Sequence, residues 1–534
     1  MTEVGVVARI EGMLRRWQWL ALALFVIGYG AATAYRASRK LFWFDEIFTV
    51  QVARLPDLRS IWAALSQGVD FNPPLFYFLT KAGVALAGPS QLGVRLPEIA
   101  GFAIFCLCLY RFVAIRSTVL GGLVAMLFPL LTGAYAYAYE ARPHAVVLGC
   151  LGVALVCWQQ AATPQGRARW PWLLGLALAL ACGLLNHAYA VLLFVPFIFG
   201  EAVRLWATRK PDWPMAWALL VGAASFAVLI PLARLASTTG IARAKAFDFS
   251  IQLLLNTYRM LLGPAVIELA VAVIAAFIVF GLARPMQPVQ TPGVSTTPPG
   301  PARHELAALC ALLLIPLFAA VLSMLTRAVP YDRYSLGLVA GCAALLGLLA
   351  GSNFKLGAAL LAAMLVQIGA DNLGFVGRSV MPEPATQIPL STHQPYFMRR
   401  YTQLNLLPEQ QAPIVLLDEL EFAPMLHYAP EGLAARLTYV VWDPGDTNGQ
   451  GYQRLQRCCQ AAGRVALAAE FLARYPFFYV YGTPRSAQRM GYLTVGGNKV
   501  EVLEMSPSYF LVSVTAVPAA AGPRPTHNGL LQTR

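Results

Sequence analysis

The stretch "WQWLALALFVIGYGAATAY", residues 17–35, contains no charged side chain and is long enough to cross a bilayer as a single helix. A spanning helix needs about 20 predominantly apolar residues, because every backbone polar group must be satisfied within the segment. Arg9, Arg15 and Arg16 precede the stretch, and no small-residue cleavage site follows it. We therefore interpret it as an uncleaved signal-anchor helix.

Runs of the same kind recur as far as residue 371. Hydrophobic residues make up 58% of the sequence and charged residues 12%, against about 45–50% and about 25% in soluble proteins. Segment 74–89 is short, has Lys81 at its centre and ends in Gly-Pro, so we expect it to lie along the membrane surface. The other runs predict a polytopic α-helical membrane protein of about 11 transmembrane helices, near residues 17–36, 96–114, 118–136, 144–161, 170–186, 188–206, 214–234, 264–283, 305–326, 335–351 and 356–371.

The basic residues lie singly or in pairs at the ends of the apolar runs. This placement suits anionic lipid better than nucleic acid, which we do not expect as a partner. With the N-terminus in the cytoplasm, the loops predicted to be cytoplasmic carry Arg111, Arg116, Arg167, Arg169, Arg204, Arg209 and Lys210. The outer loops nevertheless contain Arg142, Arg243, Lys245, Arg327 and Arg333. These outer arginines and lysines call for a second explanation.

The domain organisation follows from changes in composition. Residues 1–371 form the predicted transmembrane domain, in which 41–94 is the first outer loop with juxtamembrane helices and 285–304 a Pro-rich cytoplasmic linker. Residues 372–515 have a mixed pattern, with strands expected at 412–418 and 477–482 and a helix at 454–475. An odd number of spans places this C-terminal α/β domain outside the cytoplasm, and 516–534 is predicted to be a disordered tail.

Polar residues gather at the outer ends of the predicted helices. In this topology, several acids, three arginines and two histidines converge on one face of the bundle. Each feature alone has an ordinary structural interpretation, such as a solvated acid pair, an interfacial arginine or a packed histidine. Together, the arginines would suit a phosphate, because a guanidinium presents a fork of donors to its oxygens. The residues are Asp45, Glu46, Asn72, Arg95, Glu140, Arg142, His144, Asn186, His187, Tyr331, Asp332, Arg333 and Tyr334.

Six motifs in order carry a resemblance to a known family: "WFDEIFT", "NPPLFYFLTKAG", "GVRLPEIAGFAIFCLCLYRF", "YAYEARPHAV", "NHAYAVLLF" and "PYDRYSLG". Over roughly residues 15–350 the chain resembles GT-C glycosyltransferases, in the branch of the bacterial protein mannosyltransferase and aminoarabinose transferase relatives. The resemblance implies an active site at the acidic pair, a polyprenyl-phosphate-linked sugar as donor and an extracytoplasmic C-terminal domain. The chain departs from the relatives at Asn72, where they often have His, and at His144, where they often have Tyr.

These implications lead to a hypothesis for each site residue. The chain would be an inverting glycosyltransferase of the cytoplasmic (inner) membrane, acting on the outer face on a glycan, lipid or protein acceptor. Asp45 would be the general base, and Glu46 would orient the acceptor or help to hold a divalent cation, if one is used. The donor phosphate would be held by Arg142, Arg333 and His187, with Lys81, Arg243 and Lys245 as further candidates. The residues expected to position the substrates are Asn72, Arg95, Glu140, His144 and Tyr331, with Glu140 orienting Arg142.

Other functions stay open at this point. A non-enzymatic carrier or flippase for lipid-linked sugars would use the same arginines but would not need Asp45. Against it, the chain lacks the paired, interrupted helices in two matching halves that many transporters show. An inactive scaffold is a further alternative, and the acidic pair argues against it. The nine cysteines show no metal-ligand spacing, so the need for a metal is not decided.

Overall fold

The computed structural model divides into two compact units, Met1–Pro384 with Pro389–Thr392, and Ala385–Ile388 with His393–Arg534. The structure describes residues 3–163, 166–232, 234, 250–266, 270, 300–326, 331–380, 401, 403–442, 455–456, 463–484, 486, 490–491 and 498–516. The predicted cytoplasmic linker (up to residue 299) and the tail from 517 lie outside these residues, as do Arg243 and Lys245. Each unit is described by itself.

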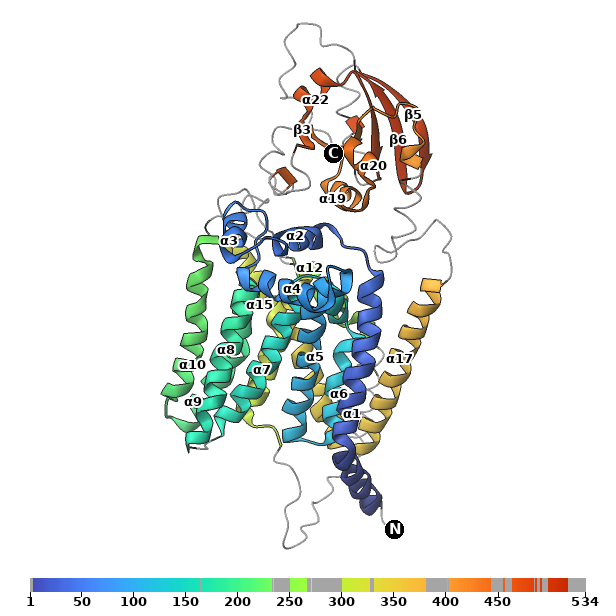
Figure 1. Ribbon diagram of the computed structural model, residues 1–534. Coiled ribbons are helices and arrows are strands. Elements are labelled where there is room, and N and C mark those ends of the chain that lie inside the picture. Colours follow the sequence, from blue (N-terminus) through green and yellow to red (C-terminus); the bar gives the residue numbers. More distant parts are fainter. Residues whose placement is uncertain are drawn as a thin grey trace. The chain divides into compact units, whose positions relative to one another are not determined.

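The first unit is a bundle of long helices (Figure 1). Its upright helices are α1 (Glu3–Arg39), α5 (Gln91–Arg116), α6 (Val119–Leu127), α7 (His144–Ala162), α8 (Trp170–Asn186), α9 (Phe194–Thr208), α10 (Trp213–Ala224), α14 (Arg303–Leu313), α15 (Ile315–Thr326), α16 (Gly337–Ser352) and α17 (Phe354–Val380). Short 3₁₀ segments extend or join them: η1 (Phe128–Leu131), η2 (Gly133–Tyr139), η3 (Gly166–Arg169), η4 (Ala188–Leu193), η5 (Ser225–Leu229), η7 (Gly263–Ala265) and η8 (Asp332–Ser335).

The lengths of these helices support a multi-pass membrane protein. Within the described residues, six helices are long and apolar enough to cross a membrane, and two bent pairs would raise the number to eight. The predicted spans 170–186 and 335–351 coincide with the shorter apolar helices α8 and α16. The predicted span 264–283 lies almost wholly outside the described residues. The total of eleven spans therefore stays a prediction.

One bent pair directs the chain toward the acidic pair. The helical segment Val119–Leu131 meets Gly133–Tyr139 at 76°. Pro129 lacks an N–H donor and Thr132 adopts an extended conformation, so the regular hydrogen-bond ladder stops there. The Thr132 hydroxyl restores part of it by donating to the Pro129 carbonyl and accepting from Ala134 N. The bend fixes the start of the turn that contains Arg142.

Close contact between α5 and α7 fixes the other side of this turn. A Cβ atom on Gly101 would lie 2.7 Å from the Cα of Val146, and one on Gly149 would lie 2.7 Å from the carbonyl oxygen of Gly101. Small residues let two membrane helices approach until their backbones touch. The buried carboxylate of Glu98 then accepts from Ala145 N and Val146 N at 3.0 Å each. It thereby caps the N-terminus of α7.

Four shorter helices complete the first unit: α2 (Phe44–Ala53), α3 (Leu58–Ser66), α4 (Pro74–Ala87) and α12 (Ile251–Leu262). In Figure 1, α2, α3 and α4 gather at one end of the upright helices. Pro74 begins α4 at a position where its missing N–H costs nothing, and Gly88 ends it with a positive φ of 78°. Within residues 41–94, where the sequence predicted juxtamembrane helices, the structure has α2, α3 and α4. We call the end of the bundle at which α2, α3 and α4 lie the Asp45 end.

The second unit is built on a six-stranded sheet in the order β3-β2-β1-β4-β6-β5. The first four strands in this order are parallel, while β6 is antiparallel to β4 and β5. The strands are β1 (Ile414–Leu416), β2 (Leu437–Val441), β3 (Val465–Leu467), β4 (Phe477–Gly482), β5 (Lys499–Ser506) and β6 (Tyr509–Thr515); the helices are α19 (Glu419–Tyr428), α20 (Glu431–Arg436) and α22 (Ala468–Arg474). The α/β character and both expected strands are confirmed.

The predicted helix over 454–475 is wrong as a single element. Val465–Leu467 forms the strand β3, which pairs with β2 through Tyr439 and Val465, and the helix α22 begins only at Ala468. Pairing with a neighbouring strand outweighs the helical pattern of this short stretch, because strand preference depends mainly on the available partners.

Candidate active site

The acidic pair lies in the first turn of α2, at the Asp45 end. Glu46 accepts a hydrogen bond from Trp43 N at 3.2 Å and so caps the helix. Carboxylates are favourable here because the first-turn N–H groups have no partners inside the helix. Asp45 is partly exposed, whereas Glu46 is fully buried. Adjacent helical residues point in different directions, so the two acids have different surroundings.

Glu46 is held from several sides by N–H donors. Arg95 donates from Nε to Oε1 at 2.8 Å and from the terminal Nη2 to Oε2 at 2.7 Å, and Ala141 N donates to Oε1 at 2.6 Å. Burial alone would raise the pKa of Glu46, but the Arg95 charge and these hydrogen bonds hold the pKa below its ordinary value. Glu46 is therefore ionised and already committed to structural partners.

Arg95 is equally occupied. Besides Glu46, its guanidinium donates to the backbone carbonyls of Ala37 and Lys40 at 2.6 Å each and of Leu41 at 3.1 Å. Its side chain has no exposed surface. The pair therefore joins the end of α1, the start of α2, helix α5 and the turn at Ala141, but neither side chain is available to a substrate.

Arg142 has donor capacity left over. Its terminal nitrogen Nη1 donates to Asp70 at 2.9 Å, with longer contacts of 3.4 Å to the Asp45 carbonyl and the Thr49 hydroxyl. The Nε–H is buried and has no acceptor among the described residues. Burial by itself lowers the pKa of Arg142, but the charges of Asp70 and Asp45 outweigh it and raise the pKa. Arg142 is thus a fixed cation close to Asp45.

Asp70 is a site residue that the sequence analysis missed. It is buried and accepts from Phe71 N at 2.9 Å, Asn72 Nδ2 at 3.3 Å, the Tyr77 hydroxyl at 2.8 Å and Arg142 at 2.9 Å. Its position two residues before "NPP" was the available signal, because the turn that starts α4 holds it near the bundle. The orienting partner of Arg142 is therefore Asp70; the carboxylate of Glu140, the predicted partner, pairs with Lys40 at 3.3 Å instead.

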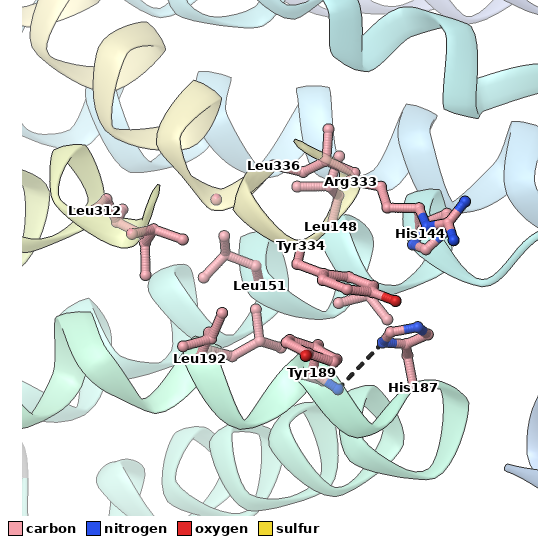
Figure 2. A pocket seen from close by; sticks show the side chains of 15 residues that line it. His144, Leu148, Leu151, His187, Tyr189, Leu192, Leu312, Arg333, Tyr334 and Leu336 are labelled. Carbon is pink, nitrogen blue, oxygen red and sulfur yellow. Dashed lines mark hydrogen bonds between the residues drawn. The ribbon is translucent and has the colours of Figure 1, made fainter. Parts of the chain in front are cut away.

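A pocket opens beside these groups and changes in character along its length. Figure 2 shows the polar and aromatic side chains of Arg333, His144, His187 and Tyr334 toward one end, and leucines toward the other. Its apolar lining comes from α7, η4, α14, α15 and α16 and consists of Val147, Leu148, Leu151, Ala190, Leu192, Leu193, Leu312, Ile315, Leu336 and Gly337. The pocket therefore places a charged group next to an apolar wall.

Aromatic rings surround the polar end of the pocket. Tyr189 and Tyr334 stack with ring centroids 3.7 Å apart, and the Arg333 guanidinium lies 4.2 Å from the Tyr331 ring centroid and 5.7 Å from that of Tyr334. Burial by itself lowers the pKa of Arg333, but the neighbouring Tyr334 and Asp45 outweigh burial, and the pKa lies above its ordinary value. Asp45 is therefore close enough to influence both Arg142 and Arg333.

The two histidines pack against each other with ring centroids 5.2 Å apart. His187 Nδ1 accepts a hydrogen bond from Tyr189 N at 3.2 Å, so this nitrogen carries no proton. Burial and the nearby charges of Arg142 and Arg333 lower the pKa of His187 to about 3. His187 is thus neutral near pH 7 and offers its other ring N–H as a donor. His144 is buried and also contacts the Tyr137 ring.

Other predicted site residues lie apart from Asp45 or are already engaged. Lys81 donates from Nζ to the carbonyls of Leu55 and Pro56 at 2.7 and 2.6 Å, which ties α4 to the α2–α3 loop. Asn72 is buried and bound to Asp70, and Tyr331 is exposed beside Arg333. Among the described residues, no group of three or more His, Cys, Asp or Glu side chains could hold a metal ion.

Comparisons with known proteins agree with this architecture. A family model described as dolichyl-phosphate-mannose-protein mannosyltransferase matches residues 72–234. A search of curated proteins gives no match. Among solved structures, ArnT from Cupriavidus metallidurans in the apo state has a TM-score of 0.58 at 13% identity, covering 96% of this chain and 100% of ArnT. ArnT bound to undecaprenyl phosphate has a TM-score of 0.56 at 14% identity, covering 95% and 100%.

At these identities the likeness to ArnT concerns the fold. The fold and the family model together confirm the resemblance to GT-C glycosyltransferases, and to the mannosyltransferase and aminoarabinose transferase branch that the six motifs indicated.

Proposed function

We propose that the protein is a membrane glycosyltransferase that moves a sugar from a polyprenyl-phosphate-linked donor to a hydroxyl group of a glycan, lipid or protein acceptor. The observation that carries this proposal is the buried Nε–H of Arg142, which lacks an acceptor beside Asp45. A buried donor without a partner costs roughly 1–3 kcal/mol. A phosphate oxygen of the donor would remove this cost. The bound undecaprenyl phosphate of the ArnT structure is a ligand of this chemical class.

The pocket supports a lipid-linked donor over a free nucleotide sugar. Arg333 lies at its polar end, and the wall of the pocket continues into leucine and isoleucine side chains from α7, α14 and α15. A phosphate at Arg333 would leave the first isoprenoid carbons against these side chains. Water-soluble donors would gain nothing from this apolar surface, whose burial stabilises a lipid by roughly 25 cal/mol per Å².

In the proposed reaction the acceptor oxygen attacks the anomeric carbon of the sugar. Its proton passes to the Asp45 carboxylate, and the bond between the anomeric carbon and the phosphate oxygen breaks. The leaving phosphate gains negative charge, which the cations Arg142 and Arg333 neutralise. The neutral His187 would add a hydrogen bond but no charge. A single base without a covalent intermediate predicts inversion at the anomeric carbon.

Glu46 and Arg95 have a positioning role in this proposal. Their mutual ion pair and their contacts to Ala141 and the end of α1 hold Asp45 and the Arg142 turn at a fixed separation. Asp70 fixes one nitrogen of Arg142 in the same way. This replaces the earlier hypothesis of acceptor or metal contact for Glu46, because its oxygens already accept four hydrogen bonds from N–H groups.

The sidedness belongs to the proposal too. The cations that break the positive-inside bias, Arg142 and Arg333, lie at the Asp45 end. We infer that this end faces the outside of the cytoplasmic membrane. The odd number of predicted spans would place residues 372–515 outside the cytoplasm as well.

The test is the substitution Asp45→Asn in purified protein supplied with a labelled polyprenyl-phosphate sugar and an acceptor hydroxyl. Release of polyprenyl phosphate should fall about 10²–10⁴-fold, because the base is lost. The matched control is Asp57→Asn in the same outer loop. Asp57 is an exposed N-cap of α3, and asparagine caps a helix equally well. Release by the variant at the wild-type rate would contradict Asp45 as base, and no release by the wild type would favour a carrier.

A further inference from the structure

Three basic residues lie in the last turn of α1 or directly after it: Arg36, Arg39 and Lys40. Together with the rings of Tyr135 and Phe375 we call them the Arg36 cluster. The Arg36 guanidinium lies 4.4 Å from the Phe375 ring centroid and 5.5 Å from that of Tyr135. Cations above aromatic faces are attracted by the ring quadrupole. The cluster therefore joins α1 to η2 and α17.

Arg36 uses only part of its hydrogen-bonding capacity. Its terminal nitrogen Nη2 donates to the Asp371 carbonyl at 3.3 Å and to Asn372 Oδ1 at 3.1 Å, both on α17. The Nε–H is buried without an acceptor. A guanidinium has five N–H donors, so those on Nε and on the second terminal nitrogen stay available among the described residues.

The charge of the cluster is only partly balanced. Lys40 pairs with Glu140 at 3.3 Å and lies over the Tyr139 ring at 5.4 Å. Arg39 is exposed and lies 5.4 Å from the Tyr35 ring centroid. Among the described residues, no carboxylate forms an ion pair with Arg36 or Arg39. Arg36 and Arg39 are thus two cations without a carboxylate partner in the described part of the chain.

Exposed apolar helix surface lies beside the cluster, as expected for a segment that contacts lipid. It lies in the last turn of a helix whose segment Arg9–Arg39 is apolar enough to cross a membrane. Only 11% of the apolar window of α17 is buried inside the protein. Beside the cluster, Leu373 is 75% and Val376 44% exposed. A cationic head with aromatic rings and an adjoining exposed apolar helix matches the interface between head groups and acyl chains.

We propose that the Arg36 cluster binds the phosphate of an anionic phospholipid from the surrounding bilayer. The terminal nitrogen of Arg36 that has no partner and the Arg39 guanidinium would donate to the phosphate oxygens, and the acyl chains would cover the exposed face of α17 near Leu373 and Val376. The lipid would stabilise the contact between α1 and α17. This site differs from the donor site, whose lining contains neither α1 nor α17.

The test measures lipid binding by the full-length protein in detergent, as a rise in melting temperature on titration with phosphatidylglycerol. Phosphatidylcholine and inorganic phosphate are the comparison ligands. We expect phosphatidylglycerol to act at least roughly tenfold more strongly than either, because phosphatidylcholine has no net negative charge for the arginines and inorganic phosphate has no acyl chains for α17. Equal effects of phosphatidylglycerol and phosphatidylcholine would overturn the proposal, and an equal effect of inorganic phosphate would overturn the lipid as its occupant.

Substitutions then locate the site. Arg36→Gln should weaken phosphatidylglycerol binding roughly tenfold or more, as expected for the loss of a charged hydrogen bond. Arg36→Lys should weaken it less, because it keeps the charge but not the planar fork of terminal donors. Arg15→Gln, on the same helix at the other end, is the matched control and should bind like the wild type. Wild-type binding by Arg36→Gln, or equal weakening by Arg15→Gln, would contradict the assignment.

A measurement on the wild type covers the case in which the variant does not fold. Phosphatidylglycerol with a photoreactive head group, incorporated into nanodiscs with the protein, should label peptides that contain residues 35–40 and 371–376. Labelling confined to other peptides would overturn the site.

Discussion

Both ends of the helical bundle contain arginines beside carboxylates. The two ends differ in how many of the arginine N–H donors have acceptors. At the end away from Asp45, Arg204 contacts both Glu201 and Asp212, and Arg169 contacts Asp212 as well. Glu201 also accepts from Trp158 at 2.7 Å. These charges neutralise one another and connect the α7–α8 loop to the α9–α10 loop.

At the Asp45 end the charges are left partly unsatisfied. Arg142 forms an ion pair with Asp70, and its buried Nε–H has no acceptor in the part of the chain that the structure describes. Arg333 contacts the rings of Tyr331 and Tyr334. Residue types alone do not separate the two ends, since both hold arginines and acids. The two ends differ in the number of N–H donors without an acceptor. In a structural network the buried donors are paired, whereas a binding site keeps donors that pair only when the ligand is bound.

The largest expected effect tests this distinction within the acidic pair. Glu46→Gln should lower the free energy of unfolding by about 3–5 kcal/mol, because it leaves the buried charge of Arg95 without its partner. The measurement is thermal or denaturant unfolding of the purified protein in detergent, beside Asp45→Asn, which should change stability little. A Glu46→Gln variant with wild-type stability but no turnover would mean that Glu46 acts on the substrate.

The next effect concerns Arg142. Arg142→Lys keeps a positive charge but loses the second donor position of the guanidinium, so the leaving phosphate would be less well stabilised. We expect turnover to fall about 10²–10³-fold, as for the removal of one fixed donor at a site of developing charge. Single-turnover kinetics with labelled donor would measure it. Arg204→Lys at the opposite end is the matched control; if it lowers turnover of folded protein equally, the contrast between the ends is false.

A smaller effect is expected from the opposite end itself. Asp212→Asn removes the charge that Arg169 and Arg204 share but keeps the cap on Met215 N. Stability should fall by about 1.5–3 kcal/mol, the range for hydrogen bonds to charged groups. Turnover per folded molecule should not change. Normal stability with impaired turnover would show that this network reaches the active site.

Much of this arrangement could be predicted because it depends on local sequence. Apolar runs of about 20 residues predict helices, and the bundle brings Asp45, Arg142, Arg333 and His187 to one end. The difference in surroundings between Asp45, which is partly exposed, and Glu46, which is fully buried, could not be predicted. It depends on the rotation of α2, which is set by the contact of Glu46 with Arg95, 49 positions along the chain.

Asp70 and the strand β3 escaped prediction for the same reason. An aspartate before a proline turn is normally an exposed turn residue, and only the fold brings Arg142 and Tyr77 to it. Val465–Leu467 has a helical pattern, and its partner β2 lies far away in sequence. In each case a long-range partner decides the outcome, and sequence periodicity records only local preference.

The smallest effect distinguishes the neutral His187 from the cations around it. Its pKa of about 3 lies below the ordinary value of about 6.5. Between these values the unfolded chain binds a proton that the folded protein does not, so wild-type stability is complete above pH 6.5 and falls as the pH drops toward 3. His187→Asn keeps an acceptor for Tyr189 N but cannot titrate. Between pH 7.5 and pH 5.5 the wild type should therefore lose about 1.4 kcal/mol more unfolding free energy than the variant. Unfolding at both pH values measures this difference, and equal losses would show that the pKa of His187 in the folded protein is close to its ordinary value, so that His187 becomes a cation below about pH 6.5.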